Sequence, residues 1–225
     1  MVLSAGIDTP KASAALEELC RTYWYPLYAY VRRRGYDAHD AQDLTQEFFA
    51  RLLEKNSLSD VHPRKGKFRS FLLGSMNNFL AKEWRRENTQ KRGGGQPIFS
   101  LDAAAAEDRY KFEPADALDP EKIFERRWAM TLLEQTLARL RQECSESGKA
   151  DLFNELKGML AGEKRQHRYA EVAARLDMTE AAVKKAAERL RDRYAELLRM
   201  EIAQTVSEPG DVDEELRDLF RALQP

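Results

Sequence analysis

The sequence is poor in the residues that mark β-rich, disulfide-bonded or membrane proteins. Eleven glycines and eight prolines among 225 residues are few for an all-β chain. The two cysteines, Cys20 and Cys144, have no cysteine or histidine at metal-binding spacing, so we expect buried, reduced thiols and no metal site. No apolar run reaches the length of a membrane span, and the first residues show no signal-sequence pattern. These shortages favour a cytoplasmic protein without membrane contact.

Signatures of catalysis are scarce as well. The three histidines, His39, His62 and His167, are isolated from any nucleophile or metal-ligand set. The glycine run at 93–95 follows no strand, so it does not have the context of a phosphate-binding loop. We therefore predict no catalytic residue, no cofactor and no enzymatic activity.

Helix formers, by contrast, are abundant, and apolar residues recur at spacings of three and four. We predict an all-α fold of two small helical domains joined by a long linker, with a helix-turn-helix in the second domain. Pro26 should kink or break the first helix, near 13–34, and Gly35 should cap its end. The predicted parts are a helical domain at 13–92, a linker at 93–120, a second domain at 121–203, and an acidic tail at 204–225 with a short helix at 211–223.

A net charge of −1 conceals two basic islands in an acidic chain. Residues 61–100 hold nine Lys/Arg against two Asp/Glu, and residues 163–200 hold ten against seven. Two such islands indicate two contacts with a polyanion. Ordinary solvated surface remains the alternative, above all for the weaker second island.

The first island begins as an apolar helix at Phe68 and ends in positive charge. Asn78, Lys82 and Arg85 are spaced i, i+4, i+7, so their side chains point one way and can bind phosphates and base edges. Trp84 can either stack on an unpaired base or close the core. The candidate contacts of this island are Asn78, Lys82, Trp84, Arg85, Arg86, Lys91 and Arg92.

The second island contains a helix-turn-helix pattern at 169–188. Ala173 stands where two helices would touch, Asp177 at the turn, and Thr179 at the N-cap of a second helix. This second helix would enter a DNA groove, although a purely structural helical hairpin is the alternative. Its outward residues are Thr179, Glu180, Ala181, Lys184, Lys185, Glu188 and Arg189.

An acidic ridge precedes the first island. Asp40, Asp43 and Glu47 share one face of the helix expected at 37–55, with Gln46 beside them. An acidic ridge close to a basic one suggests a protein partner on one side and nucleic acid on the other. Solvated surface is the alternative for the ridge taken alone.

These elements together resemble an RNA polymerase sigma factor of the extracytoplasmic-function (ECF) type. AQDLTQEFFARLLEK, 41–55, resembles the family's region 2.2, and FRSFLLGSMNNFLAKEWRRE, 68–87, resembles regions 2.3 and 2.4. YAEVAARLDMTEAAVKKAAERLR, 169–191, resembles region 4.2. The order and separation of the three motifs agree with the family, and the resemblance covers residues 13–203.

The resemblance implies a role for each motif. Asp40, Asp43, Gln46 and Glu47 would dock on the β′ subunit of bacterial core RNA polymerase, and the linker would thread toward the channels of the enzyme formed with the β subunit. The 68–92 segment would bind and melt the minus-ten promoter element, and helix 180–193 would read the minus-thirty-five element. The implied function is promoter-directed transcription initiation, with an anti-sigma factor or other regulator as a further expected partner.

The chain departs from the family pattern at two positions of the first island. Lys82 stands where relatives often have Asp, and Trp84 where they often have an aliphatic residue, so no promoter sequence can be carried over. A free-standing helix-turn-helix regulator is the main alternative, and a helical adaptor without DNA contact is a second. The 208–225 tail lies beyond the two-domain core of the family. We expect its apolar side to pack on the second domain or on a regulator, or else the tail to serve only solubility.

Overall fold

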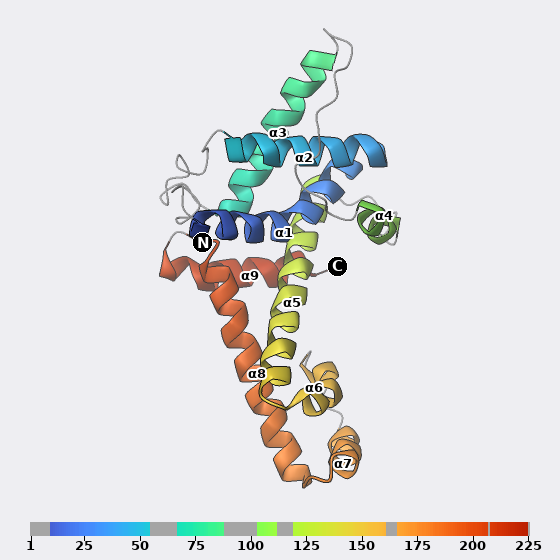
Figure 1. The fold of residues 1–225 in the computed structure, drawn as a ribbon, viewed down its shortest axis with the longest axis vertical. Helices are drawn as coiled ribbons and strands as arrows, with labels where there is room; N and C mark the ends of the chain where they lie inside the picture. The colour runs from blue at the N-terminus through green and yellow to red at the C-terminus, as the bar shows by residue number, and fades with distance from the viewer. Residues whose placement is uncertain are drawn as a thin grey trace. The chain divides into compact units, whose positions relative to one another are not determined.

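The computed structural model describes residues 10–54, 67–87, 103–111, 119–160, 166–206 and 208–224. Within these ranges the chain forms helices and turns and no β-strand, so the all-α prediction is confirmed (Figure 1). The elements are α1 (Pro10–Arg33), α2 (Ala38–Glu54), α3 (Phe68–Glu87), α4 (Ala103–Lys111), α5 (Pro120–Glu146), α6 (Ala150–Leu156), η3 (Lys157–Met159), α7 (Gln166–Arg175), α8 (Glu180–Ala203), η4 (Pro209–Asp211) and α9 (Val212–Ala222).

The chain divides into two compact units whose boundaries differ from the ranges expected from the sequence. Unit 1 takes the chain up to Thr131 together with the residues from Ile202 onward. Unit 2 comprises Leu132–Glu201. The long helices α5 and α8 therefore each contribute residues to both units, and α9 belongs to the same unit as α1, α2 and α3.

Helix α1 is the centre of unit 1. Every residue from Thr22 to Val31 is buried, and a helix that is apolar all round has to be covered on all sides. Rings from α1 and α3 meet edge to face, with the centroids of Tyr23 and Phe68 5.4 Å apart. α2 packs on both α1 and α3, and its Phe48 lies 5.8 Å from Phe79 of α3.

Pro26 lies inside α1 without ending it, so of the expected kink or break, the break is wrong. Proline in a helix interior costs about 3 kcal/mol. The buried aromatic residues on both sides of it, among them Trp24 and Tyr28, gain more from staying on one helix. The predicted cap at the end of α1 is confirmed, because Gly35 has φ 96° and its N–H donates to the carbonyl of Arg32.

The range expected to be a linker contains a helix that packs on unit 1. In α4, Glu107 accepts two hydrogen bonds from Arg32 of α1, at 3.0 and 2.9 Å, and another from the hydroxyl of Tyr28. The ring of Tyr110 lies under the guanidinium of Arg32, 4.8 Å from its centroid. Tyr110, one of the aromatic residues of this range, therefore packs against α1. Phe99 and Phe112 lie outside the described residues.

Unit 2 has two small apolar clusters. One joins α6 and η3 to α7 and the start of α8, through Leu156, Met159, Val172 and Val183. The other joins α5 to α6 and the middle of α8, through Leu140, Phe153 and Leu197. Ion pairs such as Arg193–Glu143, at 2.8 Å, link α8 to α5 at the edge of these clusters.

Candidate nucleic-acid interface

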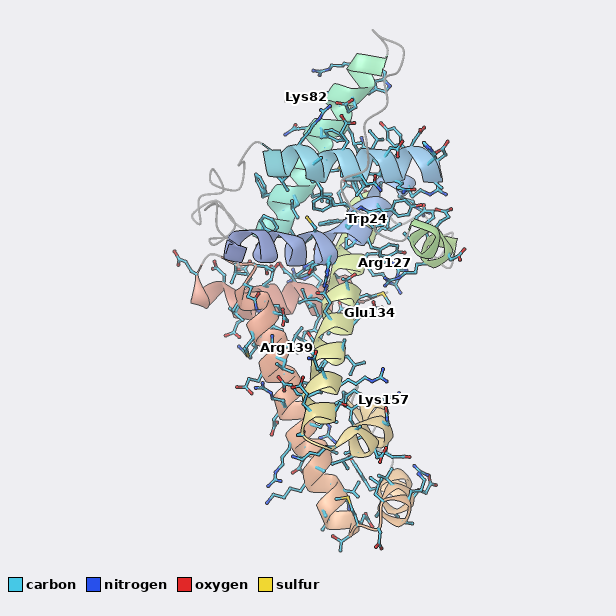
Figure 2. All side chains as sticks on the ribbon, in the orientation of Figure 1. Trp24, Lys82, Arg127, Glu134, Arg139 and Lys157 are labelled. Carbon is cyan, nitrogen blue, oxygen red and sulfur yellow. The ribbon has the colours of Figure 1, made fainter. Side chains whose placement is uncertain are left out.

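The last part of α3 presents polar and cationic side chains to solvent. Asn78, Lys82 and Arg85 are exposed, and the i, i+4, i+7 spacing places them on one face. Figure 2 shows Lys82 on the part of α3 that extends past α2. The side chain of Arg86 is not described, and Lys91 and Arg92 lie outside the described residues.

Trp84 stands in the same exposed part of α3, and its side chain is 61% exposed. The alternative that Trp84 closes the core is therefore wrong. The neighbouring residue Glu83 is the one that turns inward, with 5% of its surface exposed. An exposed indole next to cations has the chemistry that stacks on an unpaired base.

An ion pair explains why Glu83 and not Trp84 turns inward. Arg51 of α2 donates to Glu83 at 2.7 Å and to Glu47 at 2.5 Å, and its guanidinium lies 5.0 Å from the ring of Phe79. Arg51 is thus bonded to a carboxylate on each helix and covers the end of the apolar face. Helical periodicity alone could not reveal this, because the partner of Glu83 lies 32 residues earlier in the chain.

The acidic ridge on α2 is not uniform. Asp40 and Asp43 are exposed, and Asp43 lies 3.4 Å from His39. Gln46 and Glu47 are half-buried, and Glu47 is bonded to Arg51. The two aspartates are therefore the part of the ridge that is open to a partner, whereas Glu47 also stabilises the packing of α2 on α3.

Residues 166–203 fold as a short helix, a turn and a long helix with the predicted packing. Ala173 is buried in the apolar cluster. Asp177 has φ 51°, the left-handed conformation expected at the turn. The Thr179 hydroxyl accepts from the N–H of Ala182 at 3.2 Å, which confirms the predicted N-cap. The apolar residues of this segment that belong to or pack on the same cluster include Val172, Leu176, Met178, Val183 and Ala186.

The outward residues of α8 combine charge with partial pairing. Thr179, Ala181, Lys185, Glu188 and Arg189 are exposed, whereas Glu180 and Lys184 are half-buried. Lys184 pairs with Glu180 at 2.8 Å and lies 5.9 Å from the ring of Tyr169. This surface carries lysines and an arginine but no exposed aromatic residue, unlike the end of α3.

The described ranges hold few features of a metal site, a disulfide or a membrane span. They contain no group of three or more His, Cys, Asp or Glu side chains placed to hold a metal ion. Both cysteines are buried. In the part of the chain that the structure describes, no helix is both long and apolar enough to cross a membrane.

One comparison with known proteins matches the first part of the chain to a protein family. Residues 19–90 match the family model described as sigma-70 region 2. No curated protein and no solved structure matches the chain. The matched range contains α2 with its acidic ridge and all of α3, including the exposed residues Asn78, Lys82, Trp84 and Arg85. The match indicates a sigma-70 region 2 at residues 19–90 of this chain.

Proposed function

We propose that this chain is a sigma factor of the ECF type, which binds core RNA polymerase through α2 and recognises two promoter elements. The observation that carries the proposal is the end of α3, inside the matched range. There an exposed Trp84 stands beside Lys82 and Arg85 on a helix whose other face is buried. Separating a DNA duplex leaves unpaired bases and bare phosphates, and an indole with cations suits both.

The minus-ten contacts would then be Asn78, Lys82, Trp84 and Arg85, continued by Arg86, Lys91 and Arg92. The acidic residues Asp40 and Asp43 would bind the β′ subunit of the polymerase, with Gln46 and Glu47 behind them. A charged ridge of this kind raises the rate and the specificity of docking on a basic partner more than it raises raw affinity.

The minus-thirty-five contact would come from the helix-turn-helix formed by α7, the turn at Asp177 and the start of α8. Thr179, Lys185 and Arg189 are exposed at the N-terminal part of α8, which is the part that reaches base edges in this motif. Glu180, Ala181, Lys184 and Glu188 complete the proposed contact surface. A factor with this role would work in the cytoplasm, and an anti-sigma factor or other protein would regulate it.

The first test is co-migration of the purified protein with bacterial core RNA polymerase on a sizing column. We expect a stoichiometric complex that the double variant Asp40→Lys with Asp43→Lys weakens at least about tenfold. The matched control is Glu171→Lys, because Glu171 is an equally exposed acidic residue outside the ridge. Glu47 is left unchanged, since it also holds Arg51.

If no complex with polymerase forms, DNA binding by the protein alone distinguishes between the two alternative functions. A folded wild-type chain that binds duplex DNA through α8 but never binds polymerase would be a free-standing helix-turn-helix regulator. Failure to bind either would leave a helical adaptor. A complex that the ridge variant does not weaken would keep the sigma assignment but remove the role of Asp40 and Asp43.

A further inference from the structure

The C-terminal helix α9 lies outside the sigma-70 match, yet it packs on the first turn of α3 in unit 1. Arg69 of α3 donates to Glu215 at 2.6 and 3.1 Å and to Asp218 at 2.7 Å. Lys67, just before α3, adds a pair with Glu214 at 2.8 Å. The tail expected to pack on the second domain or on a regulator thus packs on the first helical domain.

The same arginine also connects α9 to α5. Its guanidinium is bonded to Glu125 of α5 and lies 4.6 Å from the ring of Trp128. The Arg69 and Glu215 side chains are 6% and 1% exposed. Arg69 is therefore the point at which α3, α5 and α9 meet.

Ion pairs attach α9 to the rest of unit 1 more than buried apolar surface does. Only two of its apolar side chains, Val212 and Leu219, are buried. The large apolar residue Phe220 is 56% exposed. Neutralising its carboxylates should loosen α9 before the rest of the unit, because Glu125 of α5 still pairs with Arg69 and the released helix lets water reach the guanidinium.

α9 leaves the proposed binding surfaces open. Its described ion pairs reach Lys67 and Arg69, and at the far end of α3 the side chains of Asn78, Lys82, Trp84 and Arg85 are exposed. Asp40 and Asp43 of α2 are also exposed in the same structure. The docked α9 is therefore compatible with binding at both places and does not block either of them.

We propose that α9 is a positioning element for α3, with Arg69 as the positioning residue. This role rests on the proposed function. α1 and α2 hold the middle of α3, through Tyr30–Asn77 and Phe48–Phe79. At its start, Tyr23 of α1 packs on Phe68, and α9 with α5 adds the ion pairs of Arg69. Two fixed points define the direction of a helix axis.

Because α3 is long, a small change in direction at its start moves the residues at its end by a large distance. Lys82 lies about 20 Å along the helix from Arg69. A tilt of about 5° at the start would move the far end by about 2 Å. A hydrogen bond or a stacking contact with a strand does not survive a shift of that size. The C-terminal helix thus serves the opening of promoter DNA, although it is far from the DNA-contacting residues in sequence.

The test compares the wild type with two variants, each made in the whole chain. Glu215→Gln with Asp218→Asn removes the α9 charges that reach Arg69. Arg217→Gln is the control on the same helix, because Arg217 is exposed and its described hydrogen bond goes to the carbonyl of Asp213 within α9. Hydrogen exchange is measured on each protein, followed by polymerase binding and by the opening of a promoter with a fluorescent base in the minus-ten element.

In the double variant we expect exchange at 212–222 and at the first turn of α3 to rise at least about tenfold, with α2 unchanged. Polymerase affinity should stay within about twofold, and promoter opening should fall at least about fivefold. A merely structural role would instead lower binding and opening together. The Arg217→Gln protein should match the wild type in all three measurements.

Four results would overturn the proposal. Unchanged exchange in the double variant would mean that other contacts hold α9. Normal opening with α9 released would make α9 dispensable for positioning, and increased opening would make it an inhibitor. If the wild type binds no polymerase, the proposed function fails and the positioning role fails with it. If the wild type binds polymerase and opens DNA, and the variant with released α9 does so equally well, only the positioning role is contradicted and the proposed function stands.

Discussion

The two ends of α3 use the same residue types in opposite ways. At its start, Arg69 lies over the buried Trp128 and is enclosed by carboxylates of two other helices. At its end, Arg85 follows an exposed Trp84. An arginine beside a tryptophan is thus a structural joint in one place and a candidate ligand surface in the other, and burial is what distinguishes them.

This difference has an energetic reason. A buried guanidinium has lost its water and has to be compensated by carboxylates, so removing either partner is expensive. An exposed guanidinium remains hydrated and gives up little if it is removed, until a phosphate arrives. The start of α3 should therefore respond to mutation through stability, and its end through DNA binding.

The largest expected effect is that of Arg69→Ala. The substitution leaves Glu215 buried without its main partner, and breaking a buried pair in this way costs about 3–5 kcal/mol. The three tryptophans, Trp24, Trp84 and Trp128, all lie in unit 1, so urea unfolding followed by tryptophan fluorescence reports on that unit. Arg85→Ala is the control, with an expected change within about 0.5 kcal/mol. Equal losses in the two variants would contradict the distinction.

Trp84→Ala tests the other end of the helix. We expect the free energy of unfolding to change by no more than about 0.5 kcal/mol, because the side chain is exposed. A core tryptophan would cost about 3–5 kcal/mol instead. Affinity for a single-stranded minus-ten oligonucleotide, measured on the polymerase complex, should fall by about 1–3 kcal/mol. Trp84→Tyr should keep most of that affinity, since it retains an aromatic face.

Local features of this fold could be predicted from the sequence, and long-range ones could not. The caps at Gly35 and Thr179 and the left-handed turn at Asp177 depend on nearby residues, and each was found where the pattern placed it. The pair of Arg69 with Glu215 joins residues 146 apart in the chain. No helical periodicity can reveal a contact of that kind.

The candidate site shows the same division. The exposed face with Asn78, Lys82 and Arg85 followed from i, i+4, i+7 spacing alone. Whether Trp84 or Glu83 turned inward depended on Arg51, which another helix supplies. The helix α4 was missed because its attachment to Arg32 and Tyr28 is a tertiary contact of a segment that reads as linker.

Arg85→Ala with Arg86→Ala should act through salt dependence. Each phosphate contact that is lost makes the slope of log affinity against log salt shallower by about 0.7 for a single strand, or about 0.9 for a duplex. The double variant should therefore change the slope by about 1.4–1.8, without loss of stability. Lys185→Ala on α8 should change the slope for minus-thirty-five duplex DNA only. An unchanged slope in the arginine variant would mean that those side chains do not contact phosphates.

The smallest effect concerns Glu125, the carboxylate that α5 contributes to the Arg69 cluster. Burial raises the pKa of Glu125, and the charge of Arg69 offsets this only in part. Burial acts in the same direction on Asp218, but Lys67 and Arg69 outweigh it and hold the pKa of Asp218 below its usual value. At neutral pH the cluster therefore favours the ionised form of Glu125 less than the ionised form of Asp218.

Glu125→Gln should accordingly leave the free energy of unfolding at pH 7 unchanged or raise it by up to about 1 kcal/mol. Any gain should vanish as the pH falls through the raised pKa of Glu125, because the wild-type carboxyl then becomes neutral as well. Asp218 should change the free energy of unfolding in the opposite direction. Its pKa is lowered in the folded protein, so its ionised form adds stability above pH 3.8, and this stability is lost as the pH falls through the pKa of the folded protein. Urea unfolding of Glu125→Gln and Asp218→Asn between pH 3 and pH 7 separates the two. A cost for Glu125→Gln as large as that for Asp218→Asn would make Glu125 an equal partner of Arg69, and the joint between α3 and α5 would then be as strong as that between α3 and α9.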